Sequence, residues 1–168
     1  QFPILNLVKY ISFRSGIAIL TALIISFLLG SPTIRFLKKL QGEGQPIRED
    51  GPQTHFAKKG TPTMGGILIL LSVTVSTLLW ADLSNQYVWI VLLVLLAYGI
   101  LGFWDDYSKI KYKNSKGVSG KVKLLWQFSV AGVAAYWTSK LAMPEHATHL
   151  AVPFFKSFLL DMGLFYFV

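Results

Sequence analysis

The sequence predicts an all-α fold, a polytopic bundle of transmembrane helices that forms a single membrane domain over residues 1–168. Three observations predict this class. Hydrophobic residues make up 53% of the chain and charged residues only 14%, where soluble domains usually have about a quarter charged. The mean hydropathy is positive, at +0.51. The apolar residues are also gathered in blocks, as a bilayer requires, because each helical crossing needs about 20 apolar residues in succession.

Four of these apolar blocks are interpreted as complete spans, and a fifth is incomplete. The complete spans are expected at about 15–30, 64–81, 87–104 and 122–143. The fifth is expected to begin near Phe158, and residues 158–168 supply only about half of the length that a crossing needs. Either that helix ends inside the bilayer or the natural chain continues.

The distribution of basic residues predicts the orientation of the spans. Cytoplasmic segments of membrane proteins carry an excess of lysine and arginine. The segments 31–63 and 105–121 are therefore expected to be cytoplasmic loops, and the N-terminus and the 82–86 turn are expected to lie outside. Lys9 and Arg14 oppose this orientation, but they are outnumbered eleven to two. The eleven residues are Arg35, Lys38, Lys39, Arg48, Lys58, Lys59, Lys109, Lys111, Lys113, Lys116 and Lys121.

The charge and the absence of cysteine exclude several functional classes. A chain without cysteine has no disulfide framework and no thiolate metal site. The net charge is +8, and the lysines lie beside apolar spans, which favours membrane lipids and phosphorylated substrates over nucleic acid as partners. A transporter would be expected to carry ionisable groups in mid-span, and spans 64–81 and 87–104 carry none.

Two adjacent acids, Asp105 and Asp106, directly follow the third span. Acids at the end of a membrane helix are costly unless they are solvated, paired or bound to a cation. Magnesium prefers such oxygen ligands and often needs only one or two carboxylates beside phosphate and water. A positioned carboxylate also acts as a base or nucleophile. The alternative is a pair of interfacial acids neutralised by Lys109.

Several lysines follow the acid pair. If the helix continues, Lys109, Lys113 and Lys116 lie on one face, with the acids one turn behind. A metal on the acids and these ammonium groups would then hold opposite sides of one phosphate group. Lys121, which follows Gly120, is interpreted as a further candidate for binding phosphate. For Lys111 the excess of positive charge in cytoplasmic loops is a sufficient explanation.

A stretch rich in glycine, proline and threonine precedes the second span. Glycine lets backbone amides approach an anion closely, threonine hydroxyls add donors, and Lys58 supplies charge. The alternative is an ordinary helix start with Thr61 or Thr63 as the N-cap, although this does not explain Gly65 and Gly66. The order of residues differs from a P-loop. His55 in the same stretch is a candidate base or phosphate ligand, but a single loop histidine is more often neither.

Three stretches together resemble one family of bacterial membrane enzymes, the phospho-N-acetylmuramoyl-pentapeptide transferases. Residues 48–52 with His55, Lys58 and residues 60–66 are similar to the first cytoplasmic loop of the family. Residues 102–107, with Lys109, Lys113, Lys116 and Gly117, are similar to its aspartate-rich second loop. Residues 152–156 resemble the stretch before its fifth span. The resemblance covers nearly the whole chain, in order, and corresponds to the N-terminal half of the family.

The resemblance implies a specific reaction. Such enzymes transfer phospho-N-acetylmuramoyl-pentapeptide from UDP-N-acetylmuramoyl-pentapeptide to undecaprenyl phosphate, giving lipid I and UMP in peptidoglycan synthesis. They need magnesium, and they act in the bacterial cytoplasmic (inner) membrane with the active site facing the cytoplasm. Two alternatives stay open: a related transferase that uses UDP-N-acetylglucosamine, and an inactive membrane fragment or scaffold, since the family's later polar loops have no counterpart here. A homodimer is also left open.

The resemblance also implies roles for individual residues. Asp105 and Asp106 match catalytic acids and magnesium ligands, and Lys58, Thr63, Lys109, Lys113 and Lys121 match contacts to substrate phosphates. In the resulting hypothesis magnesium and the lysines hold the pyrophosphate. Asp105 or Asp106 takes the proton from the lipid phosphate or helps to hold the metal. Direct attack and attack through an aspartyl-phosphate both stay open.

Overall fold

The computed structural model describes residues 7–42, 62–113, 117–142, 149–151, 159–163 and 165, and most of these residues are helical. The helices are α2 (Ile11–Gln41), α3 (Gly66–Trp80), α4 (Gln86–Lys111) and α5 (Gly120–Leu141). Two short strands follow, β1 (His149–Ala151) and β2 (Leu159–Asp161). The expectation of a mostly helical chain is therefore confirmed.

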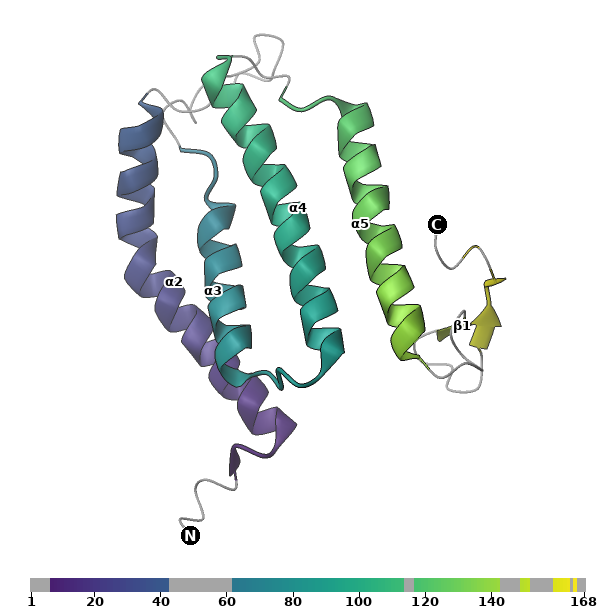
Figure 1. Ribbon diagram of the computed structural model, residues 1–168. Coiled ribbons are helices and arrows are strands. Elements are labelled where there is room, and N and C mark those ends of the chain that lie inside the picture. Colours follow the sequence, from purple (N-terminus) through teal and green to yellow (C-terminus); the bar gives the residue numbers. More distant parts are fainter. Residues whose placement is uncertain are drawn as a thin grey trace.

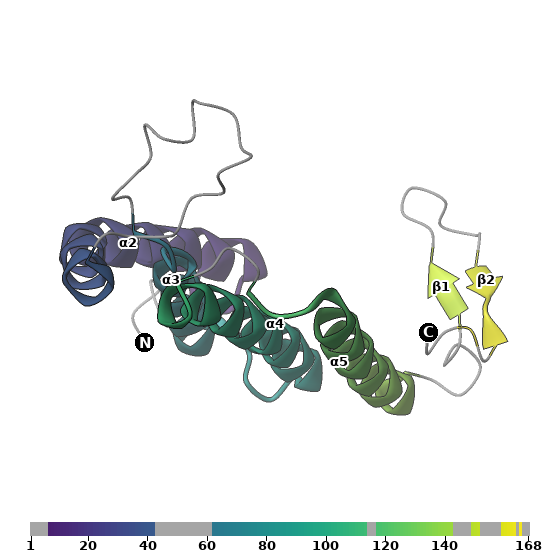
Figure 2. The same cartoon turned by 90° about the horizontal axis from the view of Figure 1, so that it is seen from above.

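The four helices lie side by side in the order of the sequence, and each packs against the next (Figure 1). Seen from above, they form an open row with the two strands beyond α5 (Figure 2). A single row buries few side chains; the buried apolar residues among those described are Leu37, Met64, Ile90, Leu92 and Leu101. Many large apolar side chains are exposed instead, such as Phe27 at 81%. An apolar surface of this extent is suited to lipid or to further protein.

Two of the described helices are long and apolar enough to cross a membrane, namely α2 and α4. Helix α3 is apolar but has only 15 residues, fewer than a crossing usually needs. Helix α5 has 22 residues, but it carries Lys121, Lys123 and Lys140 and does not reach the same hydropathy. The structure thus supports two of the four complete spans that the sequence predicts.

The end of the first helix differs from the prediction. The span 15–30 was expected to end before Pro32, but α2 continues through this proline to Gln41. A proline removes one helical hydrogen bond and bends a helix without always ending it. A bend in α2 is visible in Figure 1. The first part of the expected loop 31–63 is therefore helical and carries Arg35 and Lys38.

The third predicted span also continues further than expected. Helix α4 ends at Lys111, so the beginning of the expected loop 105–121 is helical and both acids lie on the helix. Lys113 has a positive φ of 49°, a left-handed conformation that a helix cannot contain. The prediction that Lys109 and Lys113 share one helical face is therefore wrong. The apolar pattern marks where the hydrophobic part of α4 ends, not where its hydrogen bonding ends.

Within the expected start of a fifth span at 158–168, the described residues 159–161 form strand β2 and not a helix. This strand pairs antiparallel with β1, with His149 opposite Asp161 and Leu150 opposite Leu160. Short apolar runs do not distinguish a strand from a helix by their pattern alone. Here Asp161 ends the run, and Gly163 follows with a positive φ of 50°. The all-α prediction is therefore wrong for this hairpin.

Candidate active site

Each of the four helices has one end that adjoins a basic segment, either 31–63 or 105–121. These four helix ends lie together at one end of the row (Figure 1). They are the C-terminal ends of α2 and α4 and the N-terminal ends of α3 and α5. Six side chains from these ends form a continuous set of hydrogen bonds and ion pairs, which we call the polar cluster. Its members are Gln41, Thr63, Asp105, Asp106, Lys109 and Lys123.

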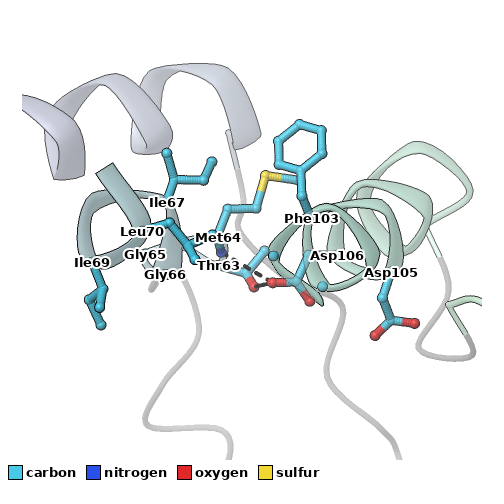
Figure 3. A pocket seen from close by; sticks show the side chains of 12 residues that line it. Thr63, Met64, Gly65, Gly66, Ile67, Ile69, Leu70, Phe103, Asp105 and Asp106 are labelled. Atoms are coloured by element: carbon cyan, nitrogen blue, oxygen red, sulfur yellow. Dashed lines mark hydrogen bonds between the residues drawn. The ribbon is translucent and has the colours of Figure 1, made fainter. Parts of the chain in front are cut away.

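Asp106 connects α4 to the segment that leads into α3. Its Oδ2 atom accepts hydrogen bonds from the Thr63 hydroxyl at 2.5 Å and from the Met64 backbone N–H at 3.2 Å. Its Oδ1 atom lies 3.3 Å from the Lys109 Nζ atom. Figure 3 shows the Asp106 carboxylate pointing toward Thr63 and Met64.

The Thr63 side chain does not cap α3. The N-cap of this helix is Gly65, and it makes no side-chain capping bond. The alternative interpretation of Thr63 as an ordinary N-cap is therefore wrong. Met64, the residue between them, is buried and has a φ of 67°, which is rare outside glycine. The backbone thus adopts an unfavourable conformation that directs two donors to Asp106.

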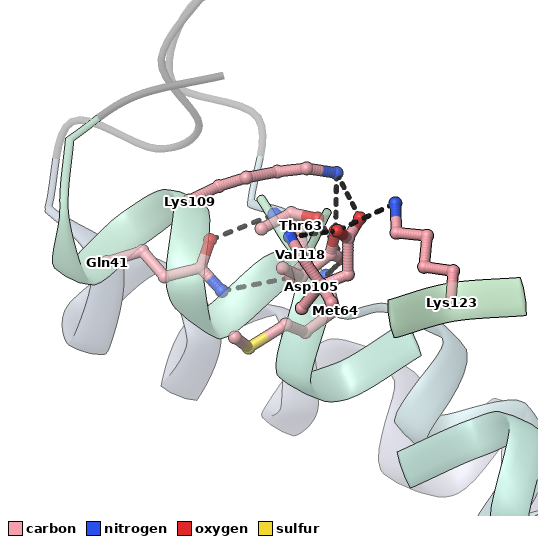
Figure 4. Close-up of polar contacts among 8 residues, drawn as sticks. Gln41, Thr63, Met64, Asp105, Lys109, Val118 and Lys123 are labelled. Carbon is pink, nitrogen blue, oxygen red and sulfur yellow. Dashed lines mark hydrogen bonds and ion pairs between the residues drawn. The ribbon is translucent and has the colours of Figure 1, made fainter. Parts of the chain in front are cut away.

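Asp105 connects α4 to the segment that leads into α5 (Figure 4). Its Oδ2 atom lies 2.7 Å from Lys109 Nζ. Its Oδ1 atom lies 2.8 Å from Lys123 Nζ and accepts a hydrogen bond of 2.8 Å from the Val118 backbone N–H. Figure 3 shows that Asp105 points away from Thr63. The two adjacent acids therefore hold different parts of the chain.

Gly117 makes the approach to Asp105 possible. It has a φ of +61°, and a Cβ atom built on it would collide with the Asp105 Oδ1 atom. Any other residue would be strained there and would also displace the carboxylate. Sequence reasoning assigned no role to Gly117, although a glycine between two lysine-bearing stretches was a usable signal.

The charges around Asp105, which follows the last residue of the apolar segment 87–104, keep it ionised. Burial raises the pKa of Asp105, but hydrogen bonds from Lys109, Lys123 and the Val118 N–H together lower that pKa to about 2. The hydrogen bond to Asp105 raises the pKa of Lys109 above its ordinary value. At neutral pH Asp105 is therefore a carboxylate and Lys109 an ammonium ion. So acidic a carboxyl group is a weak base.

An open groove of about 580 Å³ lies between the start of α3 and the end of α4. Thr63, Asp105 and Asp106 form its polar part. Gly66 and Gly102 leave open space where other residues would place a side chain. The remaining walls are apolar and consist of Met64, Ile67, Ile69, Leu70 and Phe103. Such a groove suits an amphiphile whose charged group reaches the acids (Figure 3).

The two carboxylates provide the kind of donor that magnesium prefers, one or two carboxylates completed by water and phosphate oxygens. The Asp106 Oδ1 atom is the least strongly held of their oxygens, with Lys109 at 3.3 Å. Within the described residues no group of three histidine, cysteine, aspartate or glutamate side chains could hold a metal ion. The polar cluster thus fits a magnesium ion that takes its other ligands from elsewhere.

The structure brings together four of the residues that the sequence singled out: Thr63, Asp105, Asp106 and Lys109. In the part of the chain that is described, Lys113 and Lys121 make no polar contact with the two acids. Lys123 of α5 contacts Asp105 instead. Lys58, His55 and Lys116 lie outside the described residues.

Sequence reasoning missed three further contributors, Gln41, Gly117 and Lys123. Gln41 exchanges two hydrogen bonds with the backbone of Thr63. All three act through approaches between segments that are distant in sequence. No local pattern marks Gln41, and Lys123 stands out in the sequence only as a lysine directly after the predicted start of the fourth span.

Comparisons with known proteins agree with the resemblance seen in the sequence. The motif described as phospho-N-acetylmuramoyl-pentapeptide-transferase signature 1 matches residues 58–70. The chain is 54% identical over 164 residues to a phospho-N-acetylmuramoyl-pentapeptide-transferase of Granulibacter bethesdensis, covering 97% of this chain and 45% of that protein. It is 53% identical to the protein of that name from a Ruegeria species and 52% identical to that from Ruegeria pomeroyi, covering 96% of this chain and 45% of each relative. The chain thus spans a little under half the length of these relatives, and over that length it belongs to the phospho-N-acetylmuramoyl-pentapeptide-transferase family.

Proposed function

We propose that this chain forms the N-terminal half of a transferase that moves phospho-N-acetylmuramoyl-pentapeptide from its UDP carrier to undecaprenyl phosphate, giving lipid I and UMP. The main support is the geometry of Asp106. Thr63 and Met64, which hold it, lie within the signature at 58–70, and the protonated Lys109 stands beside it at the edge of the groove. All three relatives carry the muramoyl-pentapeptide name, which favours this substrate over UDP-N-acetylglucosamine.

The proposal places the protein in the bacterial cytoplasmic membrane, with the polar cluster on the cytoplasmic side. Helices α2 and α4 have the length and composition for crossing a bilayer. The polar cluster lies at the end of the row that the basic segments approach, and cytoplasmic loops carry such an excess of lysine and arginine. The turn between α3 and α4 and the N-terminus would then face outward.

Within this proposal Lys109 binds substrate phosphate. Among the described lysines it is the one that contacts both acids, at 2.7 Å and 3.3 Å, so its ammonium group would lie close to a phosphate that reaches them. Lys58, Lys113 and Lys121 are proposed as further phosphate contacts. Magnesium, when bound, would neutralise charge on the pyrophosphate and on the leaving UMP. Asp106, with Asp105, would contribute carboxylate ligands to it.

The chemistry assigned to this half of the protein centres on Asp106. It accepts a proton from the lipid phosphate, whose oxygen then forms a bond to the sugar-linked phosphorus. The bond from that phosphorus to UMP breaks, and UMP leaves with the electron pair. Asp105 is less suited to this task, because donors at 2.7–2.8 Å occupy both of its oxygens and its pKa is about 2. A route through an aspartyl-phosphate on Asp106 also balances, and trapping of that intermediate would distinguish the two.

The test uses the complete transferase that contains this chain, with labelled UDP-N-acetylmuramoyl-pentapeptide and detection of lipid I. The loss of a positioned base reduces turnover by roughly 10²–10⁴-fold, and we expect Asp106→Asn to fall in that range. Asp105→Asn should lose less, because its main contacts hold α5. Asp82→Asn at the opposite end is the control and should keep normal turnover. Near-normal turnover in both acid variants would overturn the proposal and favour a scaffold that binds anionic lipid.

A further inference from the structure

We infer that Gln41 is a positioning residue of this site: it fixes the backbone of Thr63 and thereby the two donors that hold Asp106. The kinetic consequence of this inference rests on the proposed function, whereas the geometry does not. Gln41 is the last residue of α2, and only 8% of its surface is exposed. A buried amide is unfavourable unless its polar atoms find partners.

The partners of Gln41 are both on one residue. Its side-chain Nε2 donates to the Thr63 carbonyl oxygen at 2.9 Å, and the Thr63 N–H donates to the Gln41 Oε1 at 2.9 Å (Figure 4). The amide therefore satisfies both backbone polar groups of Thr63 at once. A residue that is held at its N–H and its carbonyl has little freedom to rotate.

The position of Thr63 directly before Met64 makes this arrangement important. The left-handed backbone of Met64, at φ 67°, is unfavourable for a methionine and persists only where its surroundings impose it. Gln41 holds the residue directly before it, and Asp106 accepts the Met64 N–H. The hydroxyl of Thr63 and the N–H of Met64 then meet on the same oxygen of Asp106.

The pair also closes the connection between α2 and α3 at its base. Gln41 and Thr63 are 22 positions apart in the sequence. Bringing two such distant points together has an entropic cost, and the two hydrogen bonds help to offset it beside the packing of α2 against α3. Gln41 makes no polar contact with Asp105 or Asp106 among the described residues, so its effect on the acids passes through Thr63.

The first experiment replaces Gln41 in the complete transferase by methionine, which keeps the length of the side chain and removes both hydrogen bonds. Because a net hydrogen bond corresponds to a factor of several in an equilibrium, we expect kcat to fall by about tenfold with little change in KM. In a Thr63→Val background the same substitution should lower kcat less than it does in the parent, since one of the two donors that it positions is gone and only the Met64 N–H remains. Gln127→Met on α5 is the control.

The second measurement is amide hydrogen exchange at Thr63 and Met64 in the same detergent-purified protein. Exchange at both should accelerate in Gln41→Met and stay unchanged at Tyr87, whose N–H is held by Asn85. Unchanged exchange at Thr63 and Met64 would overturn the inference. The inference would also be overturned if exchange became faster but kcat did not change. The same holds if Gln41→Met lowered kcat equally in the parent and in the Thr63→Val background. In either case Gln41 would only stabilise the fold. If the parent protein makes no lipid I, the proposed function fails, and exchange alone still decides whether Gln41 holds Thr63.

Discussion

The two ends of the helical row are held together in different ways. At the end with the polar cluster, two adjacent carboxylates gather donors from three other parts of the chain. At the opposite end, the described side-chain contacts between α2 and α3 instead pass through one residue, Trp80. Arg14 Nε donates to the carbonyl of Trp80 at 2.6 Å, and Trp80 Nε1 donates to the Thr21 hydroxyl at 3.0 Å.

The contacts at the opposite end complete the helices themselves. Trp80 is the last residue of α3, so its carbonyl has no partner within the helix, and Arg14 supplies one. Asn85 caps α4 by accepting the Tyr87 N–H at 3.0 Å. In the polar cluster, by contrast, α3 is left without a side-chain cap while the Thr63 hydroxyl goes to Asp106. The strained backbone of Met64 and the uncapped start of α3 both lie beside the groove, where a functional site is expected to depart from local preferences.

Among the variants that test this comparison, the largest effect on stability is expected from Gly117→Ala, which would disrupt the polar cluster. The added methyl group collides with the Asp105 carboxylate, and the residue must keep a φ of +61°. We expect a loss of at least about 2 kcal/mol in stability from strain and from the displaced carboxylate, seen as a lower thermal midpoint in detergent. Turnover of the complete transferase should also fall more than tenfold.

The matched control for this prediction is Gly120→Ala. A Cβ atom at Gly120 meets nothing within 4 Å, and the residue begins α5, where alanine is the better helix former. This variant should keep its thermal midpoint and its turnover. Equal behaviour of the two alanine variants would show that the contact between Gly117 and Asp105 does not hold the site together.

The part of the site that could be predicted from sequence is the part with local spacing. Lys109 lies four positions after Asp105 and three after Asp106 on one helix, so its contacts with both acids follow from helical geometry. The contacts of Gln41 and Lys123 depend instead on how α2 and α5 approach the other helices, and no local pattern specifies this. The existence of the helices was likewise predictable from their apolar blocks, whereas their ends were not. The charged ends of α2 and α4 continue as helix because hydrogen bonding does not stop where the apolar residues do.

A smaller loss of stability is expected at low pH, and it would test the contribution of Asp105 to the polar cluster. The pKa of Asp105 is lowered from 3.8 to about 2, so the ionised form stabilises the fold. This contribution is fully present above about pH 4 and is lost as the pH falls from about 4 toward 2. The difference corresponds to about 2 kcal/mol. The thermal midpoint in detergent should therefore drop over this range.

Lys123→Met should make that acid-dependent drop smaller, because it removes one of the donors that lower the pKa of Asp105. Lys121→Met removes a neighbouring lysine that does not contact Asp105 in the described structure, and it should leave the pH profile of the parent unchanged. If the two substitutions changed the pH profile of the thermal midpoint equally, the cause would be the general positive charge near Asp105 and not the specific ion pair with Lys123.

The smallest effect is expected at the opposite end, from Arg14→Gln compared with Lys9→Gln. Both variants remove one positive charge near the N-terminus, but only Arg14 donates to the terminal carbonyl of α3, where the helix dipole also favours a cation. Arg14→Gln should lower the thermal midpoint by an amount equivalent to about 1 kcal/mol, while Lys9→Gln should have no effect. Turnover should be normal in both variants, since this end holds α2 against α3 and does not line the groove.

The charge of Arg14 opposes the membrane orientation that the basic segments predict. Its contact with the last carbonyl of α3 explains why a cation is nevertheless present there. If Arg14→Gln reduced turnover as strongly as Gly117→Ala, the two ends would be coupled and the separation of structural and catalytic contacts would not hold.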